Sequence, residues 1–311
     1  MNTNFSIGNV NIENGLIMAP VAGYTDVGFR ALCYEYGAGL CFTEMVSAKG
    51  LCYKNPNTSA LLETAPEEKI KAVQIFGSEE DILAQAVSSK ELSKFDIIDI
   101  NMGCPVPKVV KNAEGSFLMT APDKVFNLVK AAVSASCGRP VTVKIRAGFT
   151  YNDKNAVEVA LAAQEGGASA VTVHGRTRDQ FYAGQADWGI IADVVSALKI
   201  PVIANGDVKD RESYREILKA TGATGVMIAR AALGRPYIFS ELIGIPFEYD
   251  IIDAVKKHIA KLSFLPEAVM VNNMKKQIVY YIKGMKNHRR VKEAAFAATK
   301  TADLLDALNL L

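Results

Sequence analysis

Short runs of residues typical of β-strands recur along the chain, and each ends in a polar or glycine-rich turn. Most are followed by a stretch with helical periodicity, at a spacing that suits one strand and one crossover helix per repeat. The predicted strands are Leu16–Ala19, Leu40–Met45, Ala72–Phe76, Ile97–Asn101, Val141–Arg146, Ala170–His174, Pro201–Ala204 and Gly225–Ala229. The predicted helices are Asp81–Ser89, Asp123–Ser136, Asn155–Glu165, Trp188–Leu198 and Arg211–Ala220. Eight such units predict an α/β protein with a (β/α)8 TIM barrel.

The main alternative is an open, doubly wound parallel sheet. Such sheets often carry a GxGxxG turn after the first strand, and none follows Leu16–Ala19. The length of 311 residues suits a barrel of roughly 250 residues plus a smaller remainder. Half of the residues are apolar and 22% are charged, so the chain can bury a large core. A barrel is therefore the expected fold.

The pattern changes near Gly244, after which the chain reads as helices only. We expect a catalytic barrel over 1–243 and a small all-helical domain over 244–311. The net charge is only +2, yet residues 250–311 carry eleven Lys and Arg side chains against six acidic ones. One helical face is apolar and comprises Met274, Ile278, Tyr281, Ile282 and Met285. Another face is basic and comprises Lys276, Lys283, Lys286 and Arg290. It is either a solvated face or a surface for a polyanion.

The five cysteines are odd in number, widely spaced and form no CxxC pair, which disfavours a disulfide framework or a zinc site. Neither a signal peptide nor an apolar run long enough for a membrane span is evident, so we expect a soluble cytoplasmic protein. Cys33, Cys41 and Cys137 are expected to be small buried residues, whereas Cys52 stays unassigned.

The predicted strand ends are unusually polar, and in a parallel barrel they meet at one mouth. They are Ala19–Gly23, Gln74, Asn101–Pro105, Lys144, Arg146, His174–Arg178, Asn205–Asp207, Ala229 and Arg230. A ring of polar groups indicates a ligand at the mouth. Backbone amides near Gly206 and the charge of Arg230 suit a phosphate. Lys144 suits the negative edge of a reduced flavin, although a salt bridge is the alternative. His174 is either a ligand contact or a satisfied core histidine.

Cys104 lies on a Gly-Cys-Pro turn just after a predicted strand, which is a poor place for core packing. An unperturbed thiol has a pKa of about 8.5 and is mostly protonated at neutral pH. No His or Asn is spaced beside it to form a thiolate dyad. The sequence therefore favours Cys104 as a proton donor rather than a nucleophile.

Seven segments together resemble the tRNA-dihydrouridine synthases, most closely their bacterial B-type branch. They are MAPVAGYTDVGFR (18–30), VQIFGSEE (73–80), DINMGCP (99–105), VKIRAG (143–148), VHGRTR (173–178), IANGD (203–207) and GVMIARAALGRPYIF (225–239). The resemblance covers nearly the whole chain, and DINMGCP is very specific.

The resemblance implies an FMN-dependent enzyme that reduces uridine in tRNA to 5,6-dihydrouridine, with NADPH or NADH as the reductant. A hydride from reduced FMN would reach uracil carbon 6, and Cys104 would be the general acid. No membrane or obligate protein partner is expected. Carried over by motif, the FMN contacts would be Pro20, Val21, Ala22, Gln74, Asn101, Lys144, His174, Asn205, Gly206, Asp207, Ala229 and Arg230. Asn101 would face either the flavin or the uracil.

The target base is stacked in folded RNA and has to be extruded into the mouth. A barrel with little net charge needs help to hold a polyanion, which favours an RNA contact for the basic C-terminal residues. The predicted RNA-binding residues are Arg176, Arg178, Lys275, Lys276, Lys283, Lys286, Arg289 and Arg290.

Three places depart from the family pattern. Ala229 stands where the family usually has Gly, AEGSFLM (113–119) replaces a sequence close to GAGSALL, and Lys275-Lys276-Gln277 replaces a common Arg-Lys-His cluster. Three other functions compete with tRNA reduction: another FMN-dependent barrel reductase, the same chemistry on ribosomal RNA, and a non-catalytic RNA-binding protein.

Overall fold

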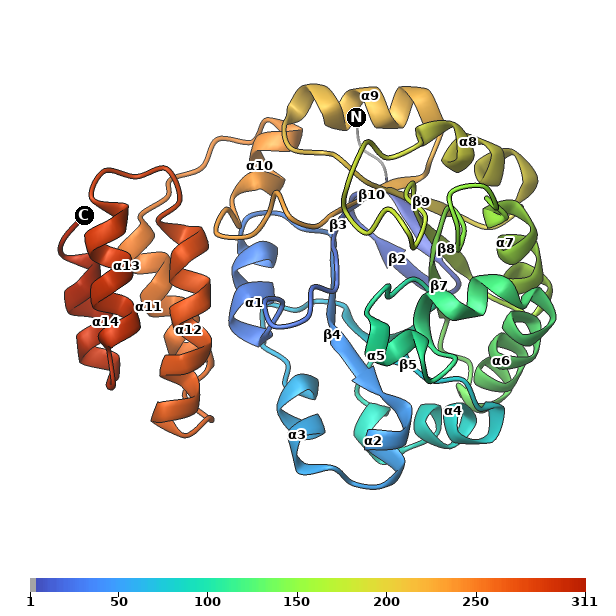
Figure 1. Ribbon diagram of the computed structural model, residues 1–311, viewed down its shortest axis with the longest axis horizontal. Coiled ribbons are helices and arrows are strands. Elements are labelled where there is room, and N and C mark those ends of the chain that lie inside the picture. Colours follow the sequence, from blue (N-terminus) through green and yellow to red (C-terminus); the bar gives the residue numbers. More distant parts are fainter. Residues whose placement is uncertain (1–3) are drawn as a thin grey trace.

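The computed structural model describes residues 4–311 and contains a closed barrel of eight parallel strands (Figure 1). The barrel strands are β3 (Leu16–Met18), β4 (Leu40–Ser47), β5 (Lys71–Phe76), β6 (Ile97–Asn101), β7 (Val141–Arg146), β8 (Ala170–His174), β9 (Val202–Asn205) and β10 (Gly225–Ile228). β10 pairs with β3, with Val226 opposite Leu16, and this pairing closes the ring. The predicted barrel is confirmed, and the open sheet is excluded.

Helices surround the barrel on the outside (Figure 1). They are α1 (Val27–Glu35), α2 (Ala48–Cys52), α3 (Pro56–Ser59), α4 (Glu80–Val87), α6 (Pro122–Ala135), α7 (Ala156–Glu165), α8 (Trp188–Ala197), α9 (Arg211–Thr221) and α10 (Ile238–Ile243). The short helix α5 (Pro107–Val110) lies in the loop after β6. The five helices expected from periodicity all form, with ends within two residues of the expected ones. Their sequences place apolar residues on the face toward the strands, as in α6, where Val125, Leu128, Val129 and Ala132 are buried.

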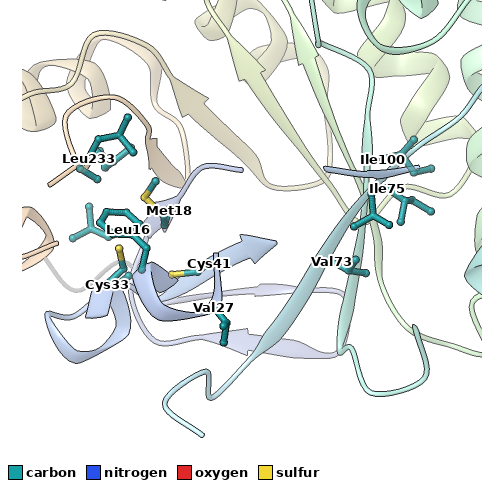
Figure 2. Close-up of a cluster of buried hydrophobic side chains, with 14 of the residues drawn as sticks. Leu16, Met18, Val27, Cys33, Cys41, Val73, Ile75, Ile100 and Leu233 are labelled. Carbon is teal, nitrogen blue, oxygen red and sulfur yellow. The ribbon is translucent and has the colours of Figure 1, made fainter. Parts of the chain in front are cut away.

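Alternate residues of each strand point outward to the helices and inward to the barrel axis. Leu16 and Met18 join the outer core between strands and helices, together with Cys33 and Cys41 (Figure 2). Ile17 faces the barrel interior instead. The prediction that Cys137 is buried is wrong, because it is exposed just after the end of α6.

A short hairpin that the sequence analysis missed covers the amino-terminal end of the barrel. Its strands are β1 (Phe5–Ile7) and β2 (Val10–Ile12), which pair antiparallel across a turn where Gly8 has a φ of +58°. Ile7 and Ile12 are fully buried against the apolar side chains at the base of the barrel. The Gly-Asn pair between two alternating segments was the available signal. Because this end is sealed, only the opposite end is free for a ligand.

Four helices follow the barrel and stand side by side beyond α1 and α10 (Figure 1). They are α11 (Ile251–Lys261), α12 (Glu267–Tyr281), α13 (His288–Ala297) and α14 (Thr301–Leu308). The single basic helical face predicted from Lys276 to Arg290 is wrong, because α12 ends at Tyr281 and the chain turns before α13. Gly284, with a φ of +81°, lies in this turn, and Met285 is 38% exposed rather than part of the apolar face. Within residues 4–311, no helix has both the length and the apolar character that crossing a membrane requires.

A buried polar junction joins α11 and α12 to the start of α1. His258 is fully buried, with Nε2 2.7 Å from Asp26 Oδ1 and Nδ1 3.0 Å from the hydroxyl oxygen of Tyr281. Gln277 donates to the backbone oxygen of Tyr24 and to Asp26. Burial raises the pKa of Asp26, but the facing His258 and the Phe29 backbone amide outweigh it, and the pKa is lowered overall. The loop between β3 and α1 is therefore held by the C-terminal helices.

Substituting Gly28 by Ala tests this junction. A Cβ at position 28 would lie 2.3 Å from His258 Cδ2 and 2.7 Å from the His258 backbone oxygen. We expect Gly28→Ala to lower the free energy of unfolding by about 1–3 kcal/mol in urea titrations, despite the better helix propensity of Ala. The control is Gly189→Ala, where the nearest atom would lie 3.2 Å away. A Gly28→Ala protein as stable as wild type would contradict the packing described.

Candidate active site

Inward-facing polar residues occupy the carboxyl-terminal half of the barrel, at successive positions of adjacent strands. Register places Gln74 of β5 beside Asp99 of β6, and Asn101 beside Lys144 of β7. It also places Arg146 of β7 beside His174 of β8. The alternation that buries apolar side chains outside therefore brings the predicted strand-end residues to one mouth, as expected for a parallel barrel.

The turn that carries Cys104 is held from several sides. Arg146 donates from Nε to the Gly103 carbonyl at 2.7 Å, and the Ser116 amide donates to the Cys104 carbonyl at 3.0 Å. Gly115 packs so closely that a Cβ there would lie 2.8 Å from the Cys104 oxygen. Burial raises the pKa of the half-buried Cys104 thiol, against the opposing pull of Arg146 and Lys144. The thiol is therefore neutral at physiological pH.

Lys144 stands next to Asn205 inside the mouth. Its ammonium donates to Asn205 Oδ1 at 3.3 Å, and Asn205 in turn donates to the Met227 carbonyl at 2.8 Å. Burial lowers the pKa of Lys144 to about 8, with a further contribution from Arg146. No carboxylate within residues 4–311 forms an ion pair with Lys144. The salt-bridge alternative is thus not realised, and the ammonium has donor capacity left for a ligand.

His174 is surrounded by positively charged side chains. It is only 8% exposed, and its pKa lies well below the ordinary value because of burial and the surrounding cations. These cations are Lys144, Arg146, Arg176 and Arg230. The imidazole is therefore neutral at physiological pH, and the excess of positive charge suits an anionic ligand.

The loop after β9 combines an unusual backbone with a carboxylate that serves the loop itself. Gly206 has a φ of +136°, and a Cβ there would lie 2.5 Å from the Ala186 Cβ. Asp207 accepts from the Ala186 amide at 2.7 Å and pairs with Arg176 at 2.8 Å and Arg230 at 3.4 Å. The side chain of Arg230 remains 54% exposed. Asp207 thus orients this loop and Arg230. It is unsuited to contact a phosphate itself, because the two negative charges would repel each other.

Two predicted contact residues lie deeper than expected. Arg176 is 2% exposed, and its guanidinium donates to the carbonyls of Ala183 and Gly184 in addition to Asp207, so the expectation that it is presented to RNA is wrong. Gln74 has no exposed surface, because it lies below the mouth against Asp99 and Asn101. Its bonding capacity is used within the barrel.

The loop between β3 and α1 forms one side of the mouth. Pro20 and Val21 are half-buried and Ala22 is exposed. Glu44 of β4 accepts from the Gly23 amide, and burial raises the pKa of its carboxyl. Lys276 of α12 reaches the same loop, with its ammonium 5.8 Å from the centre of the Tyr24 ring.

Several residues that shape the site were not assigned a role from the sequence. Asp99 lies within the DINMGCP segment, but the sequence predicted no role for it. Arg146 was predicted only to be a polar residue at a strand end. Glu44 lies within an irregular stretch of β4, between Phe42 and Met45, that no periodicity reveals. The alternation of polar and apolar residues within β6 and β7 was the signal that Asp99 and Arg146 point inward.

The predicted basic residues of the C-terminal helices are only partly gathered on one surface. Lys275 and Lys276 are half-buried. Those that stand exposed are Lys283, Lys286, Arg289 and Arg290. Arg178, near the mouth, is 29% exposed and pairs with Asp179. Gln277, in the segment that departs from the family pattern, is fully buried at the junction with Asp26, so it does not face outward.

A groove lies between the barrel and the C-terminal helices. It has a volume of about 430 Å³ and lies between the loop after β10 and α12. Its lining includes the cationic residues Arg230, Arg235 and Lys283 and the aromatic residues Tyr237, Tyr249 and Tyr280. Since Arg230 also belongs to the mouth, the groove adjoins the mouth.

Comparison of the sequence with known proteins identifies one family and several relatives. The family model for dihydrouridine synthases (Dus) matches residues 17–310. The tRNA-dihydrouridine synthase B of Vibrio cholerae serotype O1 is 43% identical over 236 residues, covering 76% of this chain and 73% of the relative. A probable tRNA-dihydrouridine synthase of Rhizobium leguminosarum bv. phaseoli is 40% identical over 276 residues, covering 88% and 86%.

Solved structures share the barrel fold at low sequence identity. Histamine dehydrogenase from Rhizobium sp. 4-9 matches with a TM-score of 0.61 and 11% identity, over 83% of this chain and 50% of that chain. Morphinone reductase in complex with tetrahydroNAD matches with a TM-score of 0.54 and 12% identity, over 79% and 91%. At this identity the likeness supports the fold alone.

Proposed function

Because the chain belongs to the dihydrouridine synthase family, we propose that it reduces uridines in tRNA to 5,6-dihydrouridine, with FMN as its cofactor and NADPH or NADH as reductant. Family membership implies a flavin enzyme. The observation that carries the proposal further is the neutral thiol of Cys104, held at a mouth rich in positive charge beside Lys144. A flavin reductase that saturates a double bond needs such a proton donor next to its cofactor.

The donors of the mouth fit FMN. The cations that keep His174 neutral leave positive charge for a phosphate and for the anionic edge of a reduced flavin. Arg230 and the backbone at Gly206 would hold the phosphate, and Lys144 would face the N1–C2 edge of the ring. The remaining proposed contacts are Pro20, Val21, Ala22, Asn101, His174, Asn205 and Ala229, and Asp207 would act by orienting Arg230. When bound and reduced, the flavin supplies the hydride that uracil carbon 6 receives.

Cys104 completes the saturation by giving a proton to uracil carbon 5. Its raised pKa keeps the proton on sulfur until the base is in place. Arg146 and Lys144 lower the pKa of the thiol against the effect of burial, so they stabilise the thiolate that remains after transfer. Arg146 also bonds Gly103, so the residue that compensates the charge also holds the turn in place. The proton source and its electrostatic support are thus built by the same strand ends.

We propose that residues 244–311 form an RNA-binding domain. Support comes from the groove between the barrel and α12, where Lys283 suits a phosphate and Tyr237 and Tyr280 suit unstacked bases. The exposed side chains Lys283, Lys286, Arg289 and Arg290 extend this surface. Such a surface has no use in a reductase that acts only on small molecules.

The direct test incubates the protein with FMN, NADPH and unmodified tRNA and measures nucleoside mass. We expect a gain of about 2 Da per reduced uridine, since each takes up one hydride and one proton. A parallel reaction with ribosomal RNA decides between the two RNA targets. An unchanged mass for both RNAs, with NADPH oxidised in the presence of small enones, would support a small-molecule reductase instead. A purified protein that retains no absorbance near 450 nm after FMN addition and removal of unbound FMN would support a non-catalytic RNA-binding role.

Replacing Cys104 by Ala removes the proposed acid. We expect Cys104→Ala to retain FMN and to be reduced by NADPH normally, while uridine reduction falls by about 10²–10⁴-fold. Single-turnover measurement of flavin reoxidation by tRNA checks this expectation. The matched control is Cys137→Ala, an exposed thiol outside the mouth. Near-normal turnover by Cys104→Ala would remove Cys104 from the mechanism.

The affinity for FMN depends on pH through Lys144. Its pKa of about 8 means that the ammonium is charged below pH 8 and is lost as the pH rises above it. We expect the FMN dissociation constant to rise by about tenfold between pH 7 and pH 9, because one favourable charge is lost. Lys144→Arg keeps the charge and should remove this rise. Fluorescence titration of flavin-free protein measures both, and equal wild-type affinity at pH 7 and 9 would refute the assignment.

Neutralising the exposed basic residues tests the RNA surface. We expect the combined substitution Lys283→Gln, Lys286→Gln and Arg290→Gln to weaken tRNA binding and to reduce the slope of log Kd against log salt by roughly 2. A control with the same change of charge replaces Lys94, Lys130 and Lys219, which lie outside the C-terminal helices. Equal salt slopes for the two triple variants would show that the basic residues are only a solvated face.

A further inference from the structure

Asp99 is a buried carboxylate beneath the mouth that the reaction described above does not use. It is 1% exposed and lies on β6 between Gln74 of β5 and Thr142 of β7. The Thr142 hydroxyl donates to Oδ1 at 2.6 Å, and Gln74 Nε2 donates to Oδ2 at 2.7 Å. Burial raises the pKa of Asp99 to about 6, so the group is still ionised at neutral pH. A buried, ionised carboxylate lowers the stability of the folded protein, so we asked what Asp99 contributes in return.

The hydrogen bonds around Asp99 continue to the turn that carries Cys104. Gln74 Oε1 accepts from Asn101 Nδ2 at 2.8 Å. Asn101 Oδ1 then accepts from the backbone amides of Gly103 at 3.2 Å and Cys104 at 2.9 Å. A single chain of bonds therefore joins the carboxylate to the backbone of the proposed proton donor.

The chain has a direction that both of its ends set: the carboxylate of Asp99 only accepts, and the backbone amides of Gly103 and Cys104 only donate. The two ends of a Gln or Asn amide have nearly the same shape, but one donates and the other accepts. An ionised carboxylate only accepts, so Gln74 has to turn its NH₂ toward Asp99 and its oxygen toward Asn101. Asn101 must then turn its oxygen toward the amide of Cys104. Reversal of the two amides would set the NH₂ of Asn101 against two backbone N–H donors, which leaves buried donors unsatisfied at about 1–3 kcal/mol.

The backbone at Cys104 depends on this acceptor. Arg146 and the Ser116 amide hold the carbonyl oxygens of Gly103 and Cys104, as described above. Only Asn101 Oδ1 is seen to accept from their amides within residues 4–311. With that acceptor lost, the turn would be fixed on one side only, and the thiol would shift relative to a base in the mouth.

We propose that Asp99 is a positioning residue that acts through Gln74 and Asn101, and that its carboxylate anchors the far end of the bonds that hold Cys104 in place for proton transfer. The proposal rests on the proposed role of Cys104 as the acid. It also accounts for the burial of Gln74, whose amide links two buried side chains rather than facing the mouth surface.

The test compares Asp99→Asn with Thr142→Val. Asn has the volume of Asp, but its amide is neutral and either end of it can face Gln74. The direction of the chain is then held only by the backbone donors at Gly103 and Cys104. We expect flavin reoxidation by tRNA to slow by about 10–100-fold in Asp99→Asn, with KM for tRNA and flavin reduction by NADPH little changed. Thr142→Val removes one donor to the carboxylate but leaves the carboxylate facing Gln74. Its reoxidation rate should fall by about threefold or less.

A second measurement does not depend on activity. We expect hydrogen exchange at the backbone amide of Cys104 to be at least about tenfold faster in Asp99→Asn than in wild type or in Thr142→Val, since protection follows local opening. Thermal unfolding and FMN content identify any general loss of structure. If wild type fails to reduce uridine while exchange responds in this way, the proposed function fails and the positioning role stands. Equal exchange in all three proteins, or equal slowing in the two variants, would overturn the positioning role.

Discussion

The pairing of β10 with β3 is the constraint on which the rest of the structure depends. It closes eight strands into a ring and so brings the ends of every strand to a common mouth. The hairpin of β1 and β2 seals the opposite end with Ile7 and Ile12. With one end filled by apolar side chains, the polar inward positions of β5 to β9 can face only one opening.

Charge is distributed within the barrel by depth. Cations with donor capacity left lie near the surface of the mouth, where Lys144 and Arg230 keep incomplete sets of partners. The carboxylates are used for construction: Asp207 orders the loop after β9, and Asp99 is satisfied by Thr142 and Gln74. The cations of the site are therefore available to a ligand. Its carboxylates hold the surrounding loops and side chains in place.

The sequence was sufficient for the barrel because the two-residue period of the strands and the 3.6-residue period of the helices are local signals. The sequence also predicted that Cys104, Lys144 and His174 lie close together, because the strand ends of a parallel barrel meet at one mouth. Contacts that depend on three-dimensional packing were out of reach. No local sequence pattern indicates that the guanidinium of Arg176 donates to carbonyls of its own loop. None indicates that the turn at Gly284 divides the basic segment between two helices, or that Gln277 is buried beside the loop before α1.

The most direct test of the central claim is a crystal structure of the protein with FMN bound. We expect one flavin at the mouth of the barrel, with its phosphate against Gly206 and Arg230, its N1–C2 edge against Lys144, and the sulfur of Cys104 over the open face of the ring. A flavin bound elsewhere, or a Cys104 side chain turned away from the ring into the apolar core, would contradict it.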